Sequence, residues 1–216
     1  MKNIITIQHT QSVQHTNGMI GSWADWDLTE LGIEQAKRIG ARLFRECGEE
    51  RYAMYASDLL RAKHTAALVA GFFGIEPVLT DALREFNLGE AVGKSKEWAR
   101  GNAACALWPG TIDWPVSVDD RPFTGAESKR EVWNRLSGFA DQILAGAEDN
   151  LIIVSHGGAL RLFYALWLGL DVEMLSRCEL RGSAGGVSFM HEDAQGRRVL
   201  SRLNDLSYRG GGVWEK

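Results

Sequence analysis

The amino-acid sequence predicts an α/β domain in which helices cover a mainly parallel β-sheet. Two short apolar segments, Ile4–Ile7 and Leu151–Val154, are rich in β-branched residues, which indicates buried strands. A histidine follows each segment two residues later, His9 in the first case and His156 in the second. Because ligands of open α/β sheets bind at the carboxyl ends of the strands, we expect both histidines at a binding edge.

Length and composition limit the class of protein. A chain of 216 residues without an apparent linker or repeat suits a single domain over residues 1–216. The net charge of −4 argues against a nucleic-acid partner. Cys47, Cys105 and Cys178 are widely spaced, which favours neither a disulfide framework nor a zinc site. No apolar run has the length of a signal peptide or a membrane span, so we predict a soluble, cytoplasmic protein without a membrane partner.

The first half of the chain contains two expected helices. Residues 10–26 show no clear period and predict a loop over the site. Thr29 is a typical helix cap, and apolar residues recur at helical spacing after it. A short strand over 52–56 precedes a second helix, which we expect Ser57 or Asp58 to cap. Arg61 then falls in the first turn, where exposed N–H groups already favour an anion. Another strand is expected over 74–79.

Residues 89–125 form an irregular stretch that contains three tryptophans, Trp98, Trp108 and Trp114. Such a long aperiodic segment within a compact domain is usually a functional loop or cap. We therefore predict a small cap at about 89–125 that selects the substrate, with the tryptophans as its own core.

The second half continues the alternation of helices and strands. Ser128 and Glu131 have the spacing of a capping box and predict a helix start. A further helix is expected to begin at Gly157, directly after the second histidine-bearing strand. Two closing strands are expected over 185–191 and 198–203, joined by a turn. The glycine-rich segment 209–216 predicts a flexible end.

Four ordered motifs together carry a resemblance to a known family. Gln8-His9-Thr10-Gln11-Ser12 is similar to R-H-G-x-S, and residues 28–36 are similar to L-T-x-x-G-x-x-Q-A. Residues 57–66 match S-D-L-x-R-A-x-x-T-A, and residues 155–158 match S-H-G-G. This order resembles the histidine phosphatase superfamily, the phosphoglycerate-mutase-like group, over nearly the whole chain. The resemblance implies a three-layer α/β/α sandwich with a small cap insertion.

The resemblance also implies roles for individual residues. His9 would be the nucleophile that forms a phosphohistidine, and Glu85 would be the general acid and base. His156, Arg61 and the amide of Gly157 would bind the phosphoryl oxygens. The implied activity is a metal-independent phosphomonoesterase that acts on a small phosphorylated metabolite and needs no cofactor.

Three positions around His9 depart from the family pattern. Gln8 stands where the family has arginine, Thr10 where it has glycine, and His15 where it usually has asparagine. Exchanging a charged donor for a neutral one should cost about 1–2 kcal/mol, or roughly tenfold in affinity or rate. A protonated His15 would compensate in part, so we hypothesise that Gln8 and His15 bind phosphate together and that activity favours mildly acidic pH.

Several functional alternatives remain open at this stage. A phosphoglycerate-type mutase would return the phosphoryl group to a bound product, and a catalytically weakened pseudo-enzyme would only bind phosphate. Gly21, Ser22 and Arg121 are candidate substrate contacts, whereas Arg84 is expected to form a structural ion pair. Either a monomer or a homodimer is compatible with the sequence, and the substrate is not identified.

Overall fold

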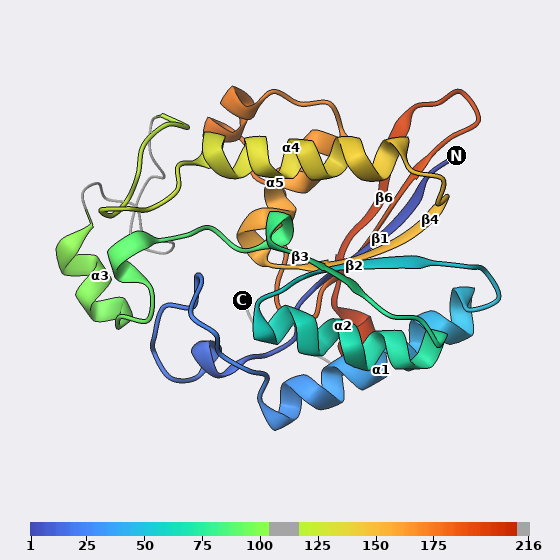
Figure 1. The fold of residues 1–216 in the computed structure, drawn as a ribbon, viewed down its shortest axis with the longest axis horizontal. Coiled ribbons are helices and arrows are strands. Elements are labelled where there is room, and N and C mark those ends of the chain that lie inside the picture. Colours follow the sequence, from blue (N-terminus) through green and yellow to red (C-terminus); the bar gives the residue numbers. More distant parts are fainter. Residues whose placement is uncertain (104–116, 211–216) are drawn as a thin grey trace.

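The computed structural model describes residues 1–103 and 117–210, and its centre is one six-stranded sheet (Figure 1). The strands are β1 (Asn3–Gln8), β2 (Ala53–Ser57), β3 (Val78–Thr80), β4 (Asn150–Ser155), β5 (Val187–Glu192) and β6 (Arg198–Asp205). Their order is β3-β2-β4-β1-β5-β6. The β3-β2-β4-β1 pairs are parallel, whereas β5 and β6 are added antiparallel, so the sheet is mixed.

Helices cover both faces of this sheet. They are α1 (Glu30–Cys47), α2 (Leu60–Phe73), α3 (Lys96–Asn102), α4 (Lys129–Ala145) and α5 (Gly157–Trp167). In Figure 1, α4 and α5 lie on one face, α1 and α2 lie on the other, and α3 stands apart from both layers. Alternate residues of one strand enter different cores: Ile153 packs with α4 and α5, whereas Ile152 and Val154 pack with α1 and α2. The three-layer architecture predicted from the sequence is therefore confirmed.

Two of the expected helix caps are confirmed. The Thr29 hydroxyl accepts a hydrogen bond from the Gly32 amide at the start of α1. Ser128 and Glu131 form the capping box of α4, in which each side chain accepts a hydrogen bond from the other residue's amide.

The expected cap of α2 is wrong. The residue before the helix is Leu59, and no side chain caps it. Ser57 contacts His156 instead, and Asp58 accepts two hydrogen bonds from Arg84 at 2.6 and 2.7 Å. Both candidate caps are thus engaged in tertiary contacts, and the Asp58–Arg84 ion pair has the structural role expected of Arg84.

One expected strand is misplaced, because residues 74–77 do not join the sheet. Gly74 ends α2 in the left-handed conformation with φ 64°, and only Val78–Thr80 pairs with β2. The closing pair β5 and β6 agrees with its prediction.

The described part of residues 89–125 contains α3 and a small separate core. The ring of Trp98 stacks on Phe123 with a centroid separation of 6.0 Å, within a cluster that includes Ile20, Ala91 and Ala99. Trp98 therefore has the core role expected of it. Trp108, Trp114 and the end of the predicted flexible tail lie outside the described residues. Within residues 1–103 and 117–210, no helix has the length and apolar character needed to cross a membrane.

Candidate active site

The two strands that carry the histidines are neighbours in the sheet. β1 and β4 pair in parallel, with Gln8 opposite Ser155, so that His9 and His156 emerge side by side. Both are buried, with exposed fractions of 2% and 0%, and their ring centroids lie 5.0 Å apart. The sheet therefore brings together the two imidazoles that the sequence placed at a binding edge.

Two hydrogen bonds define the state of His9. The Arg61 Nε–H donates to His9 Nε2 at 3.2 Å, so Nε2 must carry the lone pair. Nδ1 then holds the ring hydrogen, which it donates to the Thr10 carbonyl at 2.9 Å. Burial, followed by the charges of Arg61 and His15, holds the pKa of His9 well below its usual value. His9 is thus a neutral imidazole with a nucleophilic Nε2.

His156 has one contacted and one uncontacted ring nitrogen. Nε2 lies 2.8 Å from the Ser57 hydroxyl, which also accepts the Leu59 amide hydrogen at 3.3 Å. Ser57 can therefore donate its own hydrogen to Nε2, which leaves the ring hydrogen on Nδ1. This Nδ1 is buried and has no hydrogen-bond partner within the described ranges. Burial and the Arg61 charge keep the pKa of His156 well below its usual value.

Arg61 places a fixed positive charge beside both rings. It is the second residue of α2 and is fully buried. Its terminal nitrogens donate to the carbonyls of Ala24 at 3.0 Å and Ser22 at 2.7 Å. Burial lowers the Arg61 pKa to about 10, so the guanidinium remains charged near neutral pH. The loop over the site therefore orients the cation.

Glu85 is held against the start of α5. Its carboxylate accepts hydrogen bonds from the amides of Gly158 at 2.9 Å, Ala159 at 3.2 Å and Phe86 at 2.9 Å. A Cβ at Gly158 would lie 2.2 Å from Glu85 Oε1, so only glycine permits this approach. The carboxyl group consequently has a defined position next to the histidine pair.

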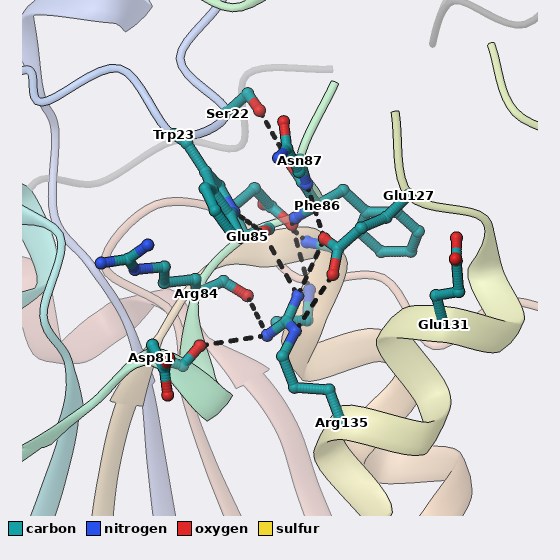
Figure 2. A network of polar contacts seen from close by, with 12 residues as sticks. Ser22, Trp23, Asp81, Arg84, Glu85, Phe86, Asn87, Glu127, Glu131 and Arg135 are labelled. Atoms are coloured by element: carbon teal, nitrogen blue, oxygen red, sulfur yellow. Dashed lines mark hydrogen bonds and ion pairs between the residues drawn. The ribbon is translucent and has the colours of Figure 1, made fainter. Parts of the chain in front are cut away.

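Arg135 is a functional neighbour that the sequence did not reveal. Its guanidinium reaches from α4 to the segment that carries Glu85 (Figure 2). It donates to the carbonyls of Ala82 at 2.8 Å and Arg84 at 3.0 Å, and it pairs with Glu127 at 3.1 Å. An arginine in an amphipathic helix looks like an ordinary surface residue, so no sequence signal singled it out.

Gln8 and Gly157 lie together beside His9 and His156. A Cβ on Gly157 would be 3.1 Å from Gln8 Nε2, so the amide of Gln8 rests against the start of α5. Gln8 Oε1 is buried and has no hydrogen-bond partner in the described part of the chain. The side chain supplies polar atoms to the site but no charge.

His15 is also present, but not as a cation. Its ring stacks on His9 with centroids 5.5 Å apart and an interplanar angle of 13°. Burial, Arg61 and Lys96 lower its pKa to about 4. Although His15 is exposed and solvent screens part of this effect, the Ser12 amide donates to its Nδ1 at 3.0 Å, which requires a lone pair there. Both observations argue against the hypothesis that His15 supplies a titrating cation at mildly acidic pH, which stays a prediction for the pH profile of activity.

The candidate substrate contacts separate into two groups. Gly21 and Ser22 line a cavity of about 220 Å³ that also reaches Glu85 and Gly158. Arg121 does not line it. Instead, Arg121 donates to Glu131 at 2.6 Å and to the Ala126 carbonyl at 3.0 Å, which gives it a structural role beside the start of α4.

A metal-binding cluster is not found in the part of the chain that the structure describes. Over residues 1–103 and 117–210, no group of three or more His, Cys, Asp and Glu side chains is arranged to hold a metal ion.

Known proteins share this fold and this sequence pattern. A 2,3-bisphosphoglycerate-dependent phosphoglycerate mutase of Nitrobacter hamburgensis is 31% identical over 211 residues, or 93% of this chain and 96% of the relative. The α-ribazole phosphatase of Shigella flexneri has a TM-score of 0.76 at 23% identity, covering 99% of this chain and 100% of that one. A phosphoserine phosphatase variant of Entamoeba histolytica has a TM-score of 0.71 at 21% identity, covering 96% and 99%. Because the model of the histidine phosphatase superfamily (branch 1) matches residues 4–205, the chain belongs to that superfamily.

Proposed function

We propose that this protein is a phosphomonoesterase that hydrolyses a small phosphorylated metabolite through a phosphohistidine on His9. The observation that carries the proposal is the neutral His9, whose Nε2 lone pair faces the guanidinium of Arg61 at 3.2 Å. A neutral nucleophile beside a permanent cation is the combination that transfer of an anionic phosphoryl group requires.

The first step transfers the phosphoryl group to the enzyme. His9 Nε2 attacks phosphorus while the bond from phosphorus to the alcohol oxygen breaks, and protonated Glu85 gives its hydrogen to the leaving oxygen. Arg61, the Nδ1–H of His156 and the amide of Gly157 stabilise the phosphoryl oxygens. The Thr10 carbonyl, which accepts the Nδ1–H of His9, stabilises the charge that develops on the ring.

The second step regenerates the enzyme. Glu85, now a carboxylate, takes a proton from water as the water oxygen attacks phosphorus and the Nε2–phosphorus bond breaks. Inorganic phosphate leaves, and His9 is again neutral and Glu85 protonated. The protein's own groups carry both steps, so we expect no metal or cofactor requirement.

A mutase is the second candidate, because a relative at 31% identity carries that name. In that reaction a hydroxyl of a bound product, instead of water, would accept the phosphoryl group from His9.

Assays with p-nitrophenyl phosphate and with 3-phosphoglycerate, each in the presence of EDTA, test the proposal. We expect hydrolysis of p-nitrophenyl phosphate by the natural chain and a loss of at least about 10³-fold in His9→Ala. His191→Ala, which changes a histidine of β5 outside the site, is the matched control and should retain activity. Equal hydrolysis by both variants would contradict the proposal. Interconversion of phosphoglycerates would favour the mutase, and phosphate binding without turnover would favour a pseudo-enzyme.

A further inference from the structure

One turn of the loop over the site contacts both Arg61 and the backbone around Glu85. Residues 21–24 form this turn, in which a hydrogen bond of 2.7 Å joins the first carbonyl to the last amide. The carbonyls of Ser22 and Ala24 accept hydrogen bonds from the terminal nitrogens of Arg61 at 2.7 and 3.0 Å. The backbone of the turn therefore orients the guanidinium beside the histidine pair.

The hydroxyl of Ser22 bridges two backbone groups that follow Glu85. It donates its hydrogen to the Phe86 carbonyl at 2.6 Å and accepts the Leu88 amide hydrogen at 2.9 Å. Ser22 is only 5% exposed, so water competes little for these contacts. The indole of Trp23 donates to the Glu85 carbonyl at 2.7 Å (Figure 2). The same turn therefore holds the segment that carries Glu85.

The backbone of Ser22 lies in a region that residues other than glycine rarely adopt. Its φ is 46°, which is the left-handed conformation. Such a backbone persists where surrounding contacts impose it, and it is common at functional sites. Glycine would adopt this φ without strain, but it has no hydroxyl to bridge residues 86 and 88. The strained serine therefore indicates that the hydroxyl is needed at this position.

The two groups that the turn contacts act at opposite ends of the bond that breaks in the proposed reaction. Arg61 stabilises the phosphoryl oxygens, and Glu85 protonates the leaving oxygen. Both must be held at a fixed separation, because a small misplacement of a reacting group slows the chemical step. Arg61 also donates to His9 Nε2 at 3.2 Å, so the turn supports the position of the nucleophile as well.

We propose that Ser22 is a positioning residue, whose hydroxyl holds residues 85–88 so that the Glu85 carboxyl group keeps a fixed place relative to Arg61. This inference rests on the proposed phosphomonoesterase function and adds a residue to its proton-transfer step. Because the single hydrogen of the hydroxyl is donated to the Phe86 carbonyl, we assign this hydroxyl to the protein backbone and not to the substrate.

Two substitutions separate the hydroxyl from the backbone conformation. Ser22→Gly removes the hydroxyl and favours the observed φ, whereas Ser22→Ala removes the hydroxyl and keeps Cβ. We expect both variants to lower kcat with benzyl phosphate about tenfold and with p-nitrophenyl phosphate much less, because nitrophenolate leaves without a proton. Full activity in Ser22→Gly beside a loss in Ser22→Ala would assign the effect to backbone strain and overturn the inference. An equal loss with both substrates would overturn it too.

Ser201→Ala is the matched control. The Ser201 hydroxyl donates to the Phe189 carbonyl at 3.1 Å on the exposed side of β6, so its loss should leave both values of kcat unchanged. Both Ser22 variants keep the main-chain carbonyl that Arg61 contacts, so the inhibition constant of inorganic phosphate should also stay unchanged in them. A rise of that constant that matches the loss of kcat would place the effect on Arg61 and contradict the assigned role.

Amide hydrogen exchange separates this inference from the proposed function. The Glu85 carboxylate accepts the amide hydrogens of Gly158 and Ala159, so the exchange rates of these amides report its position without turnover. We expect Ser22→Ala to speed their exchange at least about fivefold and Ser201→Ala to leave it unchanged. That result in a protein that hydrolyses neither ester would refute the proposed function but support the positioning role. Unchanged exchange in a protein that hydrolyses both esters would refute the positioning role alone.

Discussion

At the residue scale, single hydrogen bonds decide which atoms are available for chemistry. The contact between Arg61 Nε and His9 Nε2 fixes the tautomer of His9. The contact between the Ser12 amide and His15 Nδ1 keeps that ring neutral. Neither Gln8 nor His15 therefore supplies the positive charge that arginine provides in the family pattern. The buried amide oxygen of Gln8 lacks a hydrogen-bond partner among the described residues.

Restoring the family residue at position 8 should strengthen phosphate binding. In Gln8→Arg a charged donor replaces a neutral amide, which we expect to contribute about 1–2 kcal/mol and lower the inhibition constant of inorganic phosphate roughly tenfold. Competitive inhibition of p-nitrophenyl phosphate hydrolysis by inorganic phosphate measures this inhibition constant. Gln195→Arg, in the exposed turn between β5 and β6, makes the same charge change as a control. An unchanged constant in Gln8→Arg would show that position 8 does not contact the phosphoryl group.

Much of the candidate site was predictable at this scale, because residue type and place carried the information. His9 and His156 follow strands and Arg61 begins a helix, whereas only the family resemblance singles out Glu85. The structure brings all four together. The state of His15 was not predictable, because it depends on one amide that the loop turns toward the ring.

At the element scale, α4 positions the segment that carries Glu85. Arg135 donates to the carbonyls of Ala82, Arg84 and Glu85 in that segment and pairs with Glu127 (Figure 2). Trp23 adds a hydrogen bond to the Glu85 carbonyl at 2.7 Å. The carboxyl group of Glu85 is therefore held from its own backbone as well as from α5.

Removing the hydrogen bonds from Arg135 to the segment that carries Glu85 should impair proton donation more than phosphate binding. We expect Arg135→Met to lower kcat with benzyl phosphate about tenfold, and with p-nitrophenyl phosphate much less, because the nitrophenolate needs no proton to leave. Arg130→Met, on the same helix but paired at the surface with Asp119 and Glu173, is the control. A uniform loss with both substrates would indicate a structural role for Arg135 and no positioning of the acid.

Element boundaries show why some local predictions fail. Ser57 has the residue type of a helix cap, but the same hydroxyl can serve the His156 ring, and the tertiary contact prevails. The Thr29 hydroxyl accepts from the Gly32 amide while it donates to Gln11 Oε1 at 2.7 Å, so its other contact does not displace the cap, and Ser128 also caps its helix as expected. Sequence patterns thus predict caps well where no buried group requires the same side chain.

At the scale of the whole molecule, two buried histidines of the site make the stability of the fold sensitive to acid. His9 and His156 are buried in the neutral form, with folded-state pKa values well below their ordinary value near 6.5. Below about pH 6.5 the unfolded chain binds protons that the folded chain excludes. The contribution of the two neutral histidines to the free energy of unfolding is therefore fully present above that pH and is lost as pH falls.

Chemical denaturation as a function of pH measures this effect. His156→Gln removes one excluded proton, so the difference in unfolding free energy between the natural chain and the variant should shrink by about 1 kcal/mol per pH unit below about pH 6.5. A difference that stays constant with pH would show that His156 is protonated in the folded state.

The overall architecture was predictable because hydrophobic pattern and motif order act over the whole chain. The pairing of β1 with β4 was not evident, since strand order depends on how α1, α2, α4 and α5 divide between the two faces. This pairing is what places the two histidines in one site.

Trapping the covalent intermediate tests the central claim most directly. In Glu85→Gln, p-nitrophenyl phosphate should still phosphorylate His9, while hydrolysis of the intermediate slows because the base for water is gone. Rapid quenching in alkaline denaturant, followed by peptide mass spectrometry, should find one phosphoryl group on His9 and none in the His9→Ala, Glu85→Gln double variant. A phosphoryl group on another residue, or turnover without any phosphorylated protein, would contradict the account.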